Sequence, residues 1–576
     1  MCATRKSLPK SKPAIRRQAS GISKPAPKSL PPDAPPPPPA AAPALVKAAA
    51  PPKASARVKA APAKVTAALR ILMVASEAHP FSKTGGLADV ATALSRALGR
   101  LGHDVTLVTP RYRGVAGGKP IDAVRAYVAE RWLEATLLEV PLGPGARALL
   151  IDCPPLYDRS GLYGEQNVDY PDNAARFAFL SIAALDWAAS QPVAPSVIHT
   201  HDWQAGLLPA YARRLDAHQA AGRTVSLRDV PTVFTIHNLA YQGIFAKTWV
   251  PRLGLRWEDF TVAGFEFWDH VSFLKSGVMF SDALTTVSPA YAEEIQRPEY
   301  GYGFEGIMRA RGAALSGIVN GIDGDEWNPA SDRYLPAAFD ATEMSGKREA
   351  KRALLVAFGL AADDEALQRP VVGMVSRMVE QKGFDLIEAL ASHLPSLDAT
   401  FVVVGTGDPR FEGMWRALAA ANPSRIGTFI GFDERRAHLV EGGADIFLMP
   451  SRFEPCGLNQ MYSQRYGTVP VVRAVGGLID TVRPFNAKSG QGTGFLFNDY
   501  TPAALLEALA LALGAYRQPG QWARLQANGM KKDFSWQRSA AEYVKVYKRV
   551  IAARRKSGSG KTAGTGTQER IGRRDI

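Results

Sequence analysis

Cysteine is scarce in this chain, whose 576 residues contain only Cys2, Cys153 and Cys456. An odd, small count without the spacing of metal ligands predicts no disulfide framework and is typical of a reducing compartment. No uninterrupted apolar run approaches the roughly 20 residues that a membrane-spanning helix needs. The N-terminal stretch also lacks the apolar segment and cleavage site of a secretory signal. We therefore expect a cytoplasmic protein with no membrane partner.

Acidic residues are scarce at both ends of the chain, which explains its net charge of +15. Residues 1–70 carry 14 Lys and Arg against the single acid Asp33, and residues 551–576 carry 7 against Glu569 and Asp575. Removing these contributions of +13 and +5 leaves residues 71–550 at −3. This body has no basic stripe interleaved with aromatic residues, so we expect no nucleic-acid partner for it.

The two ends also lack the residues that build a core. Residues 1–68 are rich in Pro, Ala and Lys, with the run PPDAPPPPPAAAPA, and residues 557–576 form a tail rich in Gly, Ser and Thr. Such segments cannot bury enough apolar surface to offset the entropy of ordering, so both are predicted to be disordered. The first segment is basic, acid-poor and serine-bearing, which leaves a plastid transit peptide as an alternative.

Between these ends, apolar strands alternate with helices, which predicts an α/β fold with doubly wound sheets. A first Rossmann-like domain is expected over residues 69–316, with a strongly apolar helix at 173–189. Its expected strands cover residues 70–76, 104–110, 148–154, 197–200 and 232–236, with one more in DALTTVSPAYAEEI.

A turn-rich stretch, residues 316–329, is the predicted connection to a second Rossmann-like domain over 317–535. A helix over residues 536–556 is expected to close the body. The simplest architecture is two such domains facing each other across a cleft. The strands expected in the second domain are 370–377, 400–405, 427–432, 445–451 and 469–474.

The motif KTGGLADV, residues 83–90, links the first strand to the first helix. Gly85 and Gly86 let the backbone approach a ligand, and the free N–H groups of a helix start favour an anion beside Lys83. The spacing G-x-G-x-x-G is absent, and Thr109-Pro110-Arg111 supplies no carboxylate for a ribose, so a nicotinamide site is not indicated. The alternative is a tight turn with a solvated lysine.

In the second domain, cations precede a helix that is expected to start near Phe384. The positive charges of Arg377 and Lys382 are unfavourable beside the positive end of a helix dipole, unless a bound diphosphate neutralises them. The alternative is two solvated surface charges. Glu454, directly after a buried strand, is placed to accept hydrogen bonds from sugar hydroxyls, or alternatively to cap a helix. Cys456 is expected to be a small packed residue and not a nucleophile.

Histidines occur at two strand ends that should share one rim of the first sheet: His201, followed by Asp202 and Trp203, and His237, followed by Asn238. Two histidines on one rim favour a site over two unrelated structural side chains. No cluster of His, Asp and Glu has the spacing of metal ligands, so no metal is predicted.

Five motifs, KTGGLADV, HTHDWQAGL, HNLAYQG, SRMVEQKGFDL and SRFEPCGLNQMY, occur in this order and closely resemble the motifs of bacterial glycogen synthases. The likeness covers about residues 70 to 550. Ala88 resembles the residue found at this position in the bacterial enzymes, whereas plant starch synthases more often carry Gly there. A plastid starch synthase with a transit peptide is therefore the less favoured alternative.

The resemblance implies a GT-B fold, in which the C-terminal helix crosses back to the first domain. It also implies a retaining transfer of glucose from ADP-glucose to the non-reducing end of an α-1,4-glucan such as glycogen, without a cofactor or metal. A GT-B sugar-nucleotide epimerase and a non-catalytic glucan-binding protein are the remaining alternatives. Incubation with ADP-glucose and glycogen separates the epimerase from a synthase: a synthase extends the glucan chain, whereas an epimerase releases a free epimer.

The resemblance also implies roles for particular residues. His201, through its backbone carbonyl, lies beneath the reacting carbon, Arg377 and Lys382 neutralise the diphosphate, and Glu454 holds glucose hydroxyls. Phe432 lies where the family places an aromatic ring against adenine, and Val475 replaces a Thr found in many relatives. The other implied donor contacts are Lys83, Gly85, Gly86, Asp89, Cys456, Gly457 and Leu458, and the acceptor contacts are Tyr163, Tyr241 and Gln242.

Overall fold

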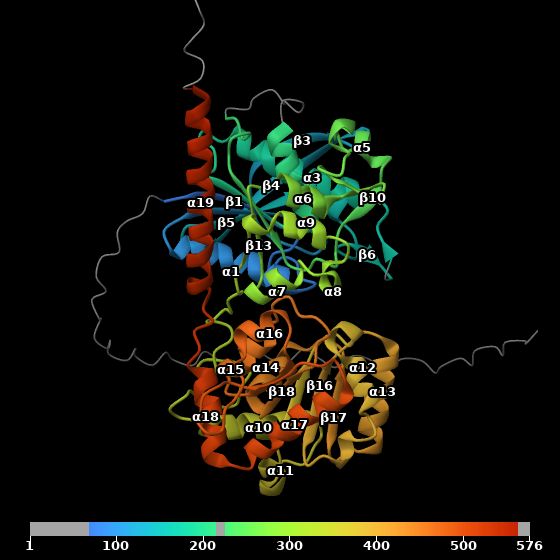
Figure 1. Ribbon diagram of the computed structural model, residues 1–576, viewed down its shortest axis with the longest axis vertical. Coiled ribbons are helices and arrows are strands. Elements are labelled where there is room, and N and C mark those ends of the chain that lie inside the picture. The colour runs from blue at the N-terminus through green and yellow to red at the C-terminus, as the bar shows by residue number, and fades with distance from the viewer. Residues whose placement is uncertain (1–67, 167, 215–224, 563–576) are drawn as a thin grey trace, which may run out of the picture. The chain divides into compact units, whose positions relative to one another are not determined.

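A computed structural model describes residues 68–166, 168–214 and 225–562 of the protein (Figure 1). Apart from Ala68, the predicted disordered extension 1–68 lies outside the described residues. Residues 563–576 of the predicted tail also lie outside them. No helix within the described ranges is both long and apolar enough to cross a membrane.

The first domain is built on a nine-stranded sheet in the order β14-β13-β9-β8-β1-β2-β5-β4-β3. The strands from β14 to β5 are parallel, and all the predicted strands are among them. Their bounds are β1 (Arg70–Val74), β2 (Asp104–Pro110), β5 (Ala146–Asp152), β8 (Val197–His201), β9 (Thr232–Ile236), β13 (Ala283–Thr286) and β14 (Leu315–Gly317).

The sequence reading missed the antiparallel hairpin at the edge of this sheet, β3 (Lys119–Val128) and β4 (Arg131–Gly143). Its turn is made by Ala129 and Glu130, whose φ angles are 51° and 63°. Such turns are usually marked by Asn-Gly or Asp-Gly, so these two residue types carry no turn signal.

Helices cover both faces of the first sheet, as a doubly wound fold requires. Ile71 and Met73 of β1 pack in one core cluster with α1 (Gly86–Arg100) and α19 (Trp536–Thr562). Leu72 and Val74 face the other way and pack with α3 (Asn173–Ser190). Successive side chains of a strand point to opposite faces, so β1 joins the two cores.

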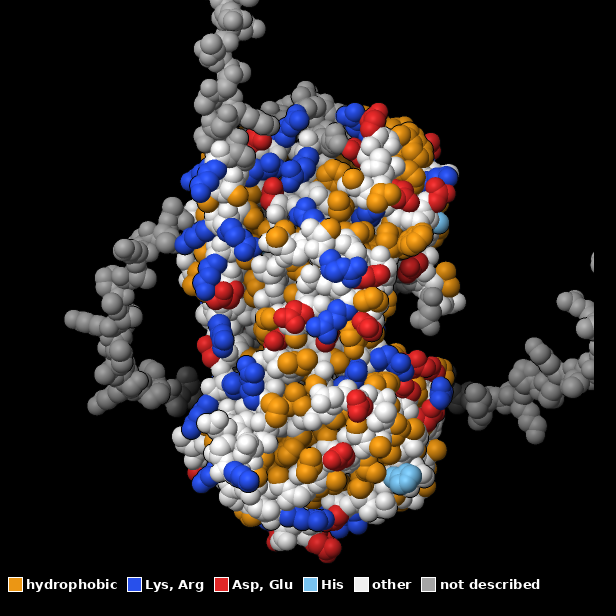
Figure 2. Space-filling model, in the orientation of Figure 1, with side chains coloured by type: hydrophobic (Ala, Val, Ile, Leu, Met, Phe, Trp, Pro, Cys, Tyr) orange, Lys and Arg blue, Asp and Glu red, His pale blue; other side chains and the backbone are white. Residues whose placement is uncertain are grey.

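The C-terminal helix α19 returns to the first domain, as predicted, and packs on α1 (Figure 1). Tyr543, Tyr547 and Val550 lie on its buried face, whereas Lys545 and Lys548 are exposed. Figure 2 shows Lys and Arg side chains gathered along this edge of the molecule. The helix ends at Thr562 and not at Lys556 as predicted. Extending an existing helix avoids the cost of nucleation, so it continues into the Gly- and Ser-rich tail.

The second domain contains a parallel six-stranded sheet in the order β17-β16-β15-β18-β19-β20. Helices α12 (Phe384–Ala389), α13 (Pro409–Ala421) and α17 (Pro502–Tyr516) pack on one face, and α10 (Ser345–Ala357) and α14 (Glu434–Gly443) on the other. Five strands were predicted, β15 (Val371–Val375), β16 (Thr400–Gly405), β17 (Ile426–Ile430), β18 (Ile446–Met449) and β19 (Val469–Arg473), and the short β20 (Phe495–Phe497) was missed.

The chain passes between the two domains twice, and the two passages lie side by side. Strand β14 pairs with β13 and ends at Gly317, inside the stretch expected to connect the domains. Beyond it, the backbone N–H of Ile322 donates to the carbonyl of Phe534 at 2.8 Å. The Ser539 hydroxyl donates to the carbonyl of Val319 at 2.7 Å. The outgoing and returning segments are thereby hydrogen-bonded to each other.

Candidate functional site

A cavity of about 820 Å³ lies where the carboxyl ends of both parallel sheets meet. The first domain contributes residues that follow β1, β8 and β9, including Glu77, Asp202 and His237. The second contributes residues that follow β15 and β18, including Arg377 and Glu454. Parallel α/β sheets bind ligands at this edge, and the volume is that of a small-molecule site.

Most of the predicted site residues line this one cavity, and four do not. The residues absent from its wall are Lys83, Asp89, His201 and Phe432. Those that line it are Gly85, Gly86, Tyr163, Tyr241, Gln242, Arg377, Lys382, Glu454, Cys456, Gly457 and Leu458.

Lys382 and Glu454 form an ion pair in the cavity wall. The Lys382 Nζ lies 2.6 Å from Glu454 Oε2, and the two side chains are 20% and 6% exposed. Glu454 also accepts a hydrogen bond from the Ser451 hydroxyl at 3.1 Å. The helix that follows, α15 (Asn459–Arg465), begins after Leu458 and has no side-chain cap. The alternative of a helix-capping Glu454 is therefore wrong.

Arg377 adds a second cation to the same wall. Its side chain is exposed, and its guanidinium donates to Gln381 Oε1 at 3.2 Å. Gln381 and Lys382 also line the cavity. Two cationic side chains beside a cavity can attract a diphosphate, so the alternative of unrelated surface charges fits this placement less well.

The glycine turn presents the start of α1 to the cavity. Gly85 is the residue before the helix, and a Cβ added to it would meet nothing within 4 Å. Glu77 holds the turn from beneath, since it accepts from the Thr84 N–H at 2.5 Å and from the Thr84 hydroxyl at 2.6 Å. Unpaired N–H groups of a helix start beside open space can bind an anion.

Lys83 does not line this cavity. Its Nζ pairs with Asp89 at 2.8 Å, with side-chain exposures of 46% and 25%. The structure therefore does not bring Lys83 and Arg377 together in one wall. An ion pair this exposed contributes at most about 1 kcal/mol, so a phosphate could displace Asp89 as the partner of Lys83. The donor roles of both residues stay predictions.

Three histidines lie together at the first-domain side of the cavity: His199 and His201 are buried, and His237 is partly buried. His201 ends β8, and its Nδ1 is 3.0 Å from Nε2 of His237, which does line the cavity. The ring of His201 also lies against that of His199. Burial lowers the pKa of His201 well below its usual value and that of His237 to about 3. Both rings are therefore neutral at neutral pH.

Asp202 and Glu77 are acidic groups in the cavity wall. Asp202 has a φ angle of 55°, and its carboxylate accepts from the His237 N–H at 2.7 Å. Burial raises the pKa of Asp202 to about 7. Strained backbone of this kind is concentrated at functional sites. The sequence reading missed Glu77, although a carboxylate three residues after β1 is the same signal that identified Glu454 after β18.

Glu77 also holds the side chain of Tyr163, one of the predicted acceptor contacts. The Tyr163 hydroxyl donates to Glu77 Oε1 at 2.5 Å and lies 2.8 Å from the Ser76 hydroxyl. Of the other two predicted acceptor contacts, Tyr241 is exposed, and the Gln242 amide donates to the carbonyl of Tyr302 at 3.0 Å. The acceptor roles of these three residues stay predictions.

Two further predicted residues differ sharply in exposure. Phe432 follows β17 and is 82% exposed, so its ring is open to a stacking partner. Its role against adenine stays a prediction. Cys456 is buried, and burial raises the pKa of its thiol to about 12, which suits the packing role that we expected.

Outside the cavity wall, the described part of the chain holds one group of three potential metal ligands, Glu326, Glu434 and His438. They belong to the connecting stretch and to α14, far apart in the sequence. The sequence reading therefore found no ligand spacing for them.

Comparison with known proteins gives two family matches. Residues 70–310 match the family described as starch synthase catalytic domain, and residues 361–526 match glycosyl transferases group 1. A glycogen synthase of Anaeromyxobacter sp. (strain Fw109-5) is 49% identical over 493 residues, which is 84% of this chain and 100% of that protein. One of Koribacter versatilis (strain Ellin345) is 43% identical over 489 residues, covering 84% and 99%.

Solved structures show the same architecture. The catalytic domain of starch synthase IV from Arabidopsis thaliana, bound to ADP and acarbose, matches with a TM-score of 0.76 and 31% identity. The match covers 84% of this chain and 100% of that one. Sucrose-phosphate synthase from Thermosynechococcus elongatus, at a TM-score of 0.53 and 18% identity, shares the fold.

Proposed function

Since this chain belongs to the glycogen synthase family and elongates glycogen by glucosyl transfer, we propose that its donor is ADP-glucose. The acceptor in this proposal is the 4-hydroxyl at the non-reducing end of an α-1,4-glucan, and the transfer retains the anomeric configuration. The ADP bound to the starch synthase IV domain supports this choice of nucleotide. No cofactor or metal takes part in the proposed transfer.

The observation that carries the proposal is the pair Lys382–Glu454 in the cavity wall, with Arg377 beside it. Departure of ADP concentrates negative charge on its terminal phosphate. Lys382 and Arg377, with the N–H groups at the start of α1, supply positive charge that is already in place when this happens. Glu454, held by Lys382 and Ser451, faces the donor sugar and accepts from its hydroxyls.

The glucose ring becomes cationic as ADP leaves, so a positive side chain beneath it would slow the reaction. Burial keeps His201 and His237 neutral, which removes that repulsion. The backbone carbonyl of His201 then faces the developing positive charge in this proposal. The bond from C1 to the phosphate oxygen breaks, the bond from C1 to the acceptor oxygen forms on the same face, and the leaving phosphate takes the acceptor proton.

Water must be excluded, because it would hydrolyse the activated sugar. The cavity is lined from both domains, and they are joined by the two hydrogen-bonded passages near Ile322 and Phe534. Closure about these passages would bring the walls together over the donor. We also propose a cytoplasmic location, supported by the free and buried Cys153 and Cys456.

The test is incorporation of labelled glucose into glycogen from ADP-glucose and, separately, from UDP-glucose. We expect chain extension with the α-configuration, and a clearly higher rate with ADP-glucose. Faster transfer from UDP-glucose would contradict the proposed donor. Release of a free epimer without chain extension would favour an epimerase, and binding of glycogen without turnover would favour a glucan-binding protein.

A further inference from the structure

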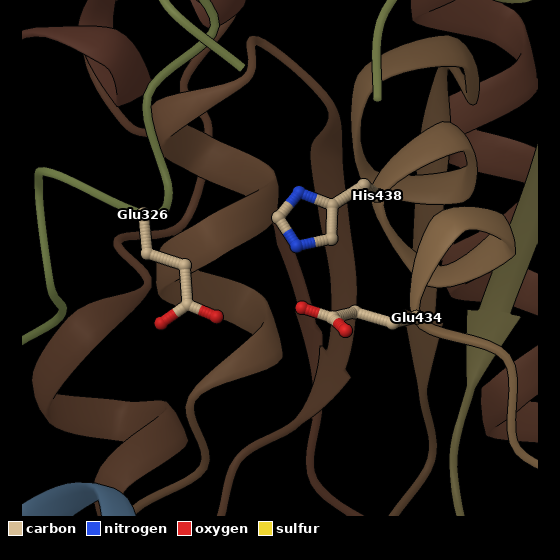
Figure 3. Close-up of side chains that lie close together, drawn as sticks. All are labelled: Glu326, Glu434 and His438. Atoms are coloured by element: carbon tan, nitrogen blue, oxygen red, sulfur yellow. The ribbon is translucent and has the colours of Figure 1, made fainter. Parts of the chain in front are cut away.

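Glu326, Glu434 and His438 form a cluster outside the wall of the main cavity. One donor atom from each lies within 4.8 Å of the others, and Figure 3 shows the two carboxylates and the imidazole turned toward a common space. We propose that these three side chains bind a divalent transition-metal ion, with Zn²⁺ as the closest chemical match.

The imidazole of His438 is held in an orientation that suits a metal ligand. His438 Nδ1 lies 2.7 Å from Asp332 Oδ2, and both side chains are 1% exposed. Asp332 also accepts from the Tyr466 hydroxyl at 2.6 Å. With Nδ1–H donated to a carboxylate, Nε2 is the ring nitrogen left to bind a metal. This arrangement of carboxylate and histidine is common behind metal ligands, where it fixes the tautomer and the ring orientation.

The other ring nitrogen, Nε2 of His438, is the second observation that points to a ligand. It is buried and has no hydrogen-bond partner. The ring cannot easily turn to find one, because Trp327 stacks on it with 3.9 Å between ring centroids and 9° between planes. Leaving a buried polar atom unsatisfied costs about 1–3 kcal/mol, so a bound ion would remove a penalty that the fold otherwise carries.

The two carboxylates reach this nitrogen from different elements. Glu434 is four residues before His438 on α14, and residues with that spacing share one face of a helix. Glu326 comes from the stretch that follows β14 and precedes α10. Arg333 competes for Glu434 only weakly, since the charged atoms are 3.9 Å apart and the Arg333 side chain is 77% exposed.

The donor set selects the class of metal. Imidazole nitrogen and carboxylate oxygen are both ligand types that Zn²⁺ accepts, and three protein ligands would leave the fourth tetrahedral position to water. Mg²⁺ and Ca²⁺ prefer sites made of oxygen alone, so the imidazole disfavours them. A bound ion would tie the connecting stretch, through Glu326, to α14 of the second domain.

The experiment is a Zn²⁺ titration of the full chain by calorimetry after treatment with a chelator, with a parallel Mg²⁺ titration. Glu326→Gln and Glu434→Gln each remove a charged ligand and keep the shape of the side chain. Loss of even an outer-shell partner weakens metal sites by about 10–100-fold, so we expect each variant to bind the ion at this site at least about tenfold more weakly. The control is Glu507→Gln, an exposed glutamate on α17.

The difference between proteins is the readout, because other histidines and cysteines of the chain can also bind zinc. We expect the parent and Glu507→Gln to bind one more Zn²⁺ per chain than either cluster variant, and to gain thermal stability with zinc that the cluster variants do not gain. Equal zinc binding by all four proteins would refute the site. Binding of Mg²⁺ as tight as that of Zn²⁺, lost in the same variants, would refute ligation by the imidazole.

Discussion

Replacing Lys382 with Met tests the central ion pair of the proposed donor site. The ammonium has two functions in our account: it holds Glu454 in place and it neutralises the departing diphosphate. Met keeps an unbranched apolar side chain nearly as long as that of Lys, and removes the ammonium with its charge and its hydrogen-bond donors. The variant should therefore lose both stability and turnover, and the two losses have separate causes.

The stability loss follows from burial. With the Lys382 contact at 2.6 Å gone, the nearly buried Glu454 carboxylate keeps the Ser451 hydroxyl as a partner. Breaking a buried ion pair costs about 3–5 kcal/mol, and the 20% exposure of Lys382 places the expected loss near the lower end. For turnover, loss of one preorganised partner of the developing charge costs about 10²–10³-fold in kcat.

Adding Glu454→Gln to this variant separates the two effects. The double variant has no buried unpaired charge, so most of the lost stability should return. Its turnover should stay low, because nothing replaces the cation beside the diphosphate and the Glu454→Gln change removes the carboxylate proposed to accept from the sugar hydroxyls. Urea unfolding measures the first quantity, and the initial rate of glucose incorporation at saturating ADP-glucose measures the second. Lys488→Met, at an exposed lysine of the second domain, is the matched control.

Either of two results would contradict the proposed role of Lys382. One is a kcat for Lys382→Met within about twofold of the parent, far from the 10²-fold loss expected for a partner of the developing charge. The other is recovery of kcat together with stability in the double variant, since the lysine would then act only by holding the fold.

Three further predictions concern the exposed ring of Phe432, Tyr547 on the returning helix α19, and His237 in the cavity wall. Phe432→Ala should raise the KM for ADP-glucose about tenfold by loss of base stacking and leave urea unfolding unchanged, whereas Phe432→Tyr should keep the parent KM. An unchanged KM in Phe432→Ala would remove the ring from the donor site. Tyr547→Phe removes the 2.8 Å contact with His199 Nδ1 in a buried site and should lower the free energy of unfolding by about 1–3 kcal/mol; equal stability would mean that His199 finds another partner. The pKa of His237 is about 3 in the folded protein and 6.5 in the unfolded chain. Between these pH values the unfolded state binds a proton that the folded state does not. The free energy of unfolding therefore falls as the pH is lowered through this window. His237→Gln should therefore unfold in urea with a pH slope that is shallower by up to about 1.4 kcal/mol per pH unit over that window, and an identical slope would contradict the low pKa. Asp202, with its pKa raised to about 7, contributes the opposite slope between about pH 4 and 7 in both proteins.

Much of the fold could be predicted because its central strands are buried on both faces. Residues 401–404, for example, are continuously apolar, and all of β16 is buried. Helices follow such strands at regular intervals. The hairpin β3–β4 was missed for the opposite reason: it lies at an edge, one face of β3 is exposed, and its turn uses Ala129 and Glu130. Strand β20 has only three residues, too few for any periodic signal.

The site was predictable where function depends on the position of the backbone, and less so where it depends on side-chain direction. Gly85, Lys382 and Glu454 each follow a strand of a parallel sheet, and that topology brings them to one edge. The Lys83 side chain could pair with a bound phosphate or with Asp89, and the sequence does not choose between them. In the structure its Nζ lies 2.8 Å from Asp89. The cluster with His438 depends on the tertiary fold, because Glu326 reaches it from the start of the second domain's sequence, far from α14.

The return of α19 has a consequence for the order in which the protein matures. One face of the first sheet is covered by Trp536, Tyr543 and Tyr547, which are among the last described residues to leave the ribosome. Until they arrive, Ile71 and Met73 lack part of their cover, so the N-terminal half cannot finish folding as an independent unit during synthesis. A chain truncated before α19 should be captured by chaperones even though both sheets are fully encoded in it.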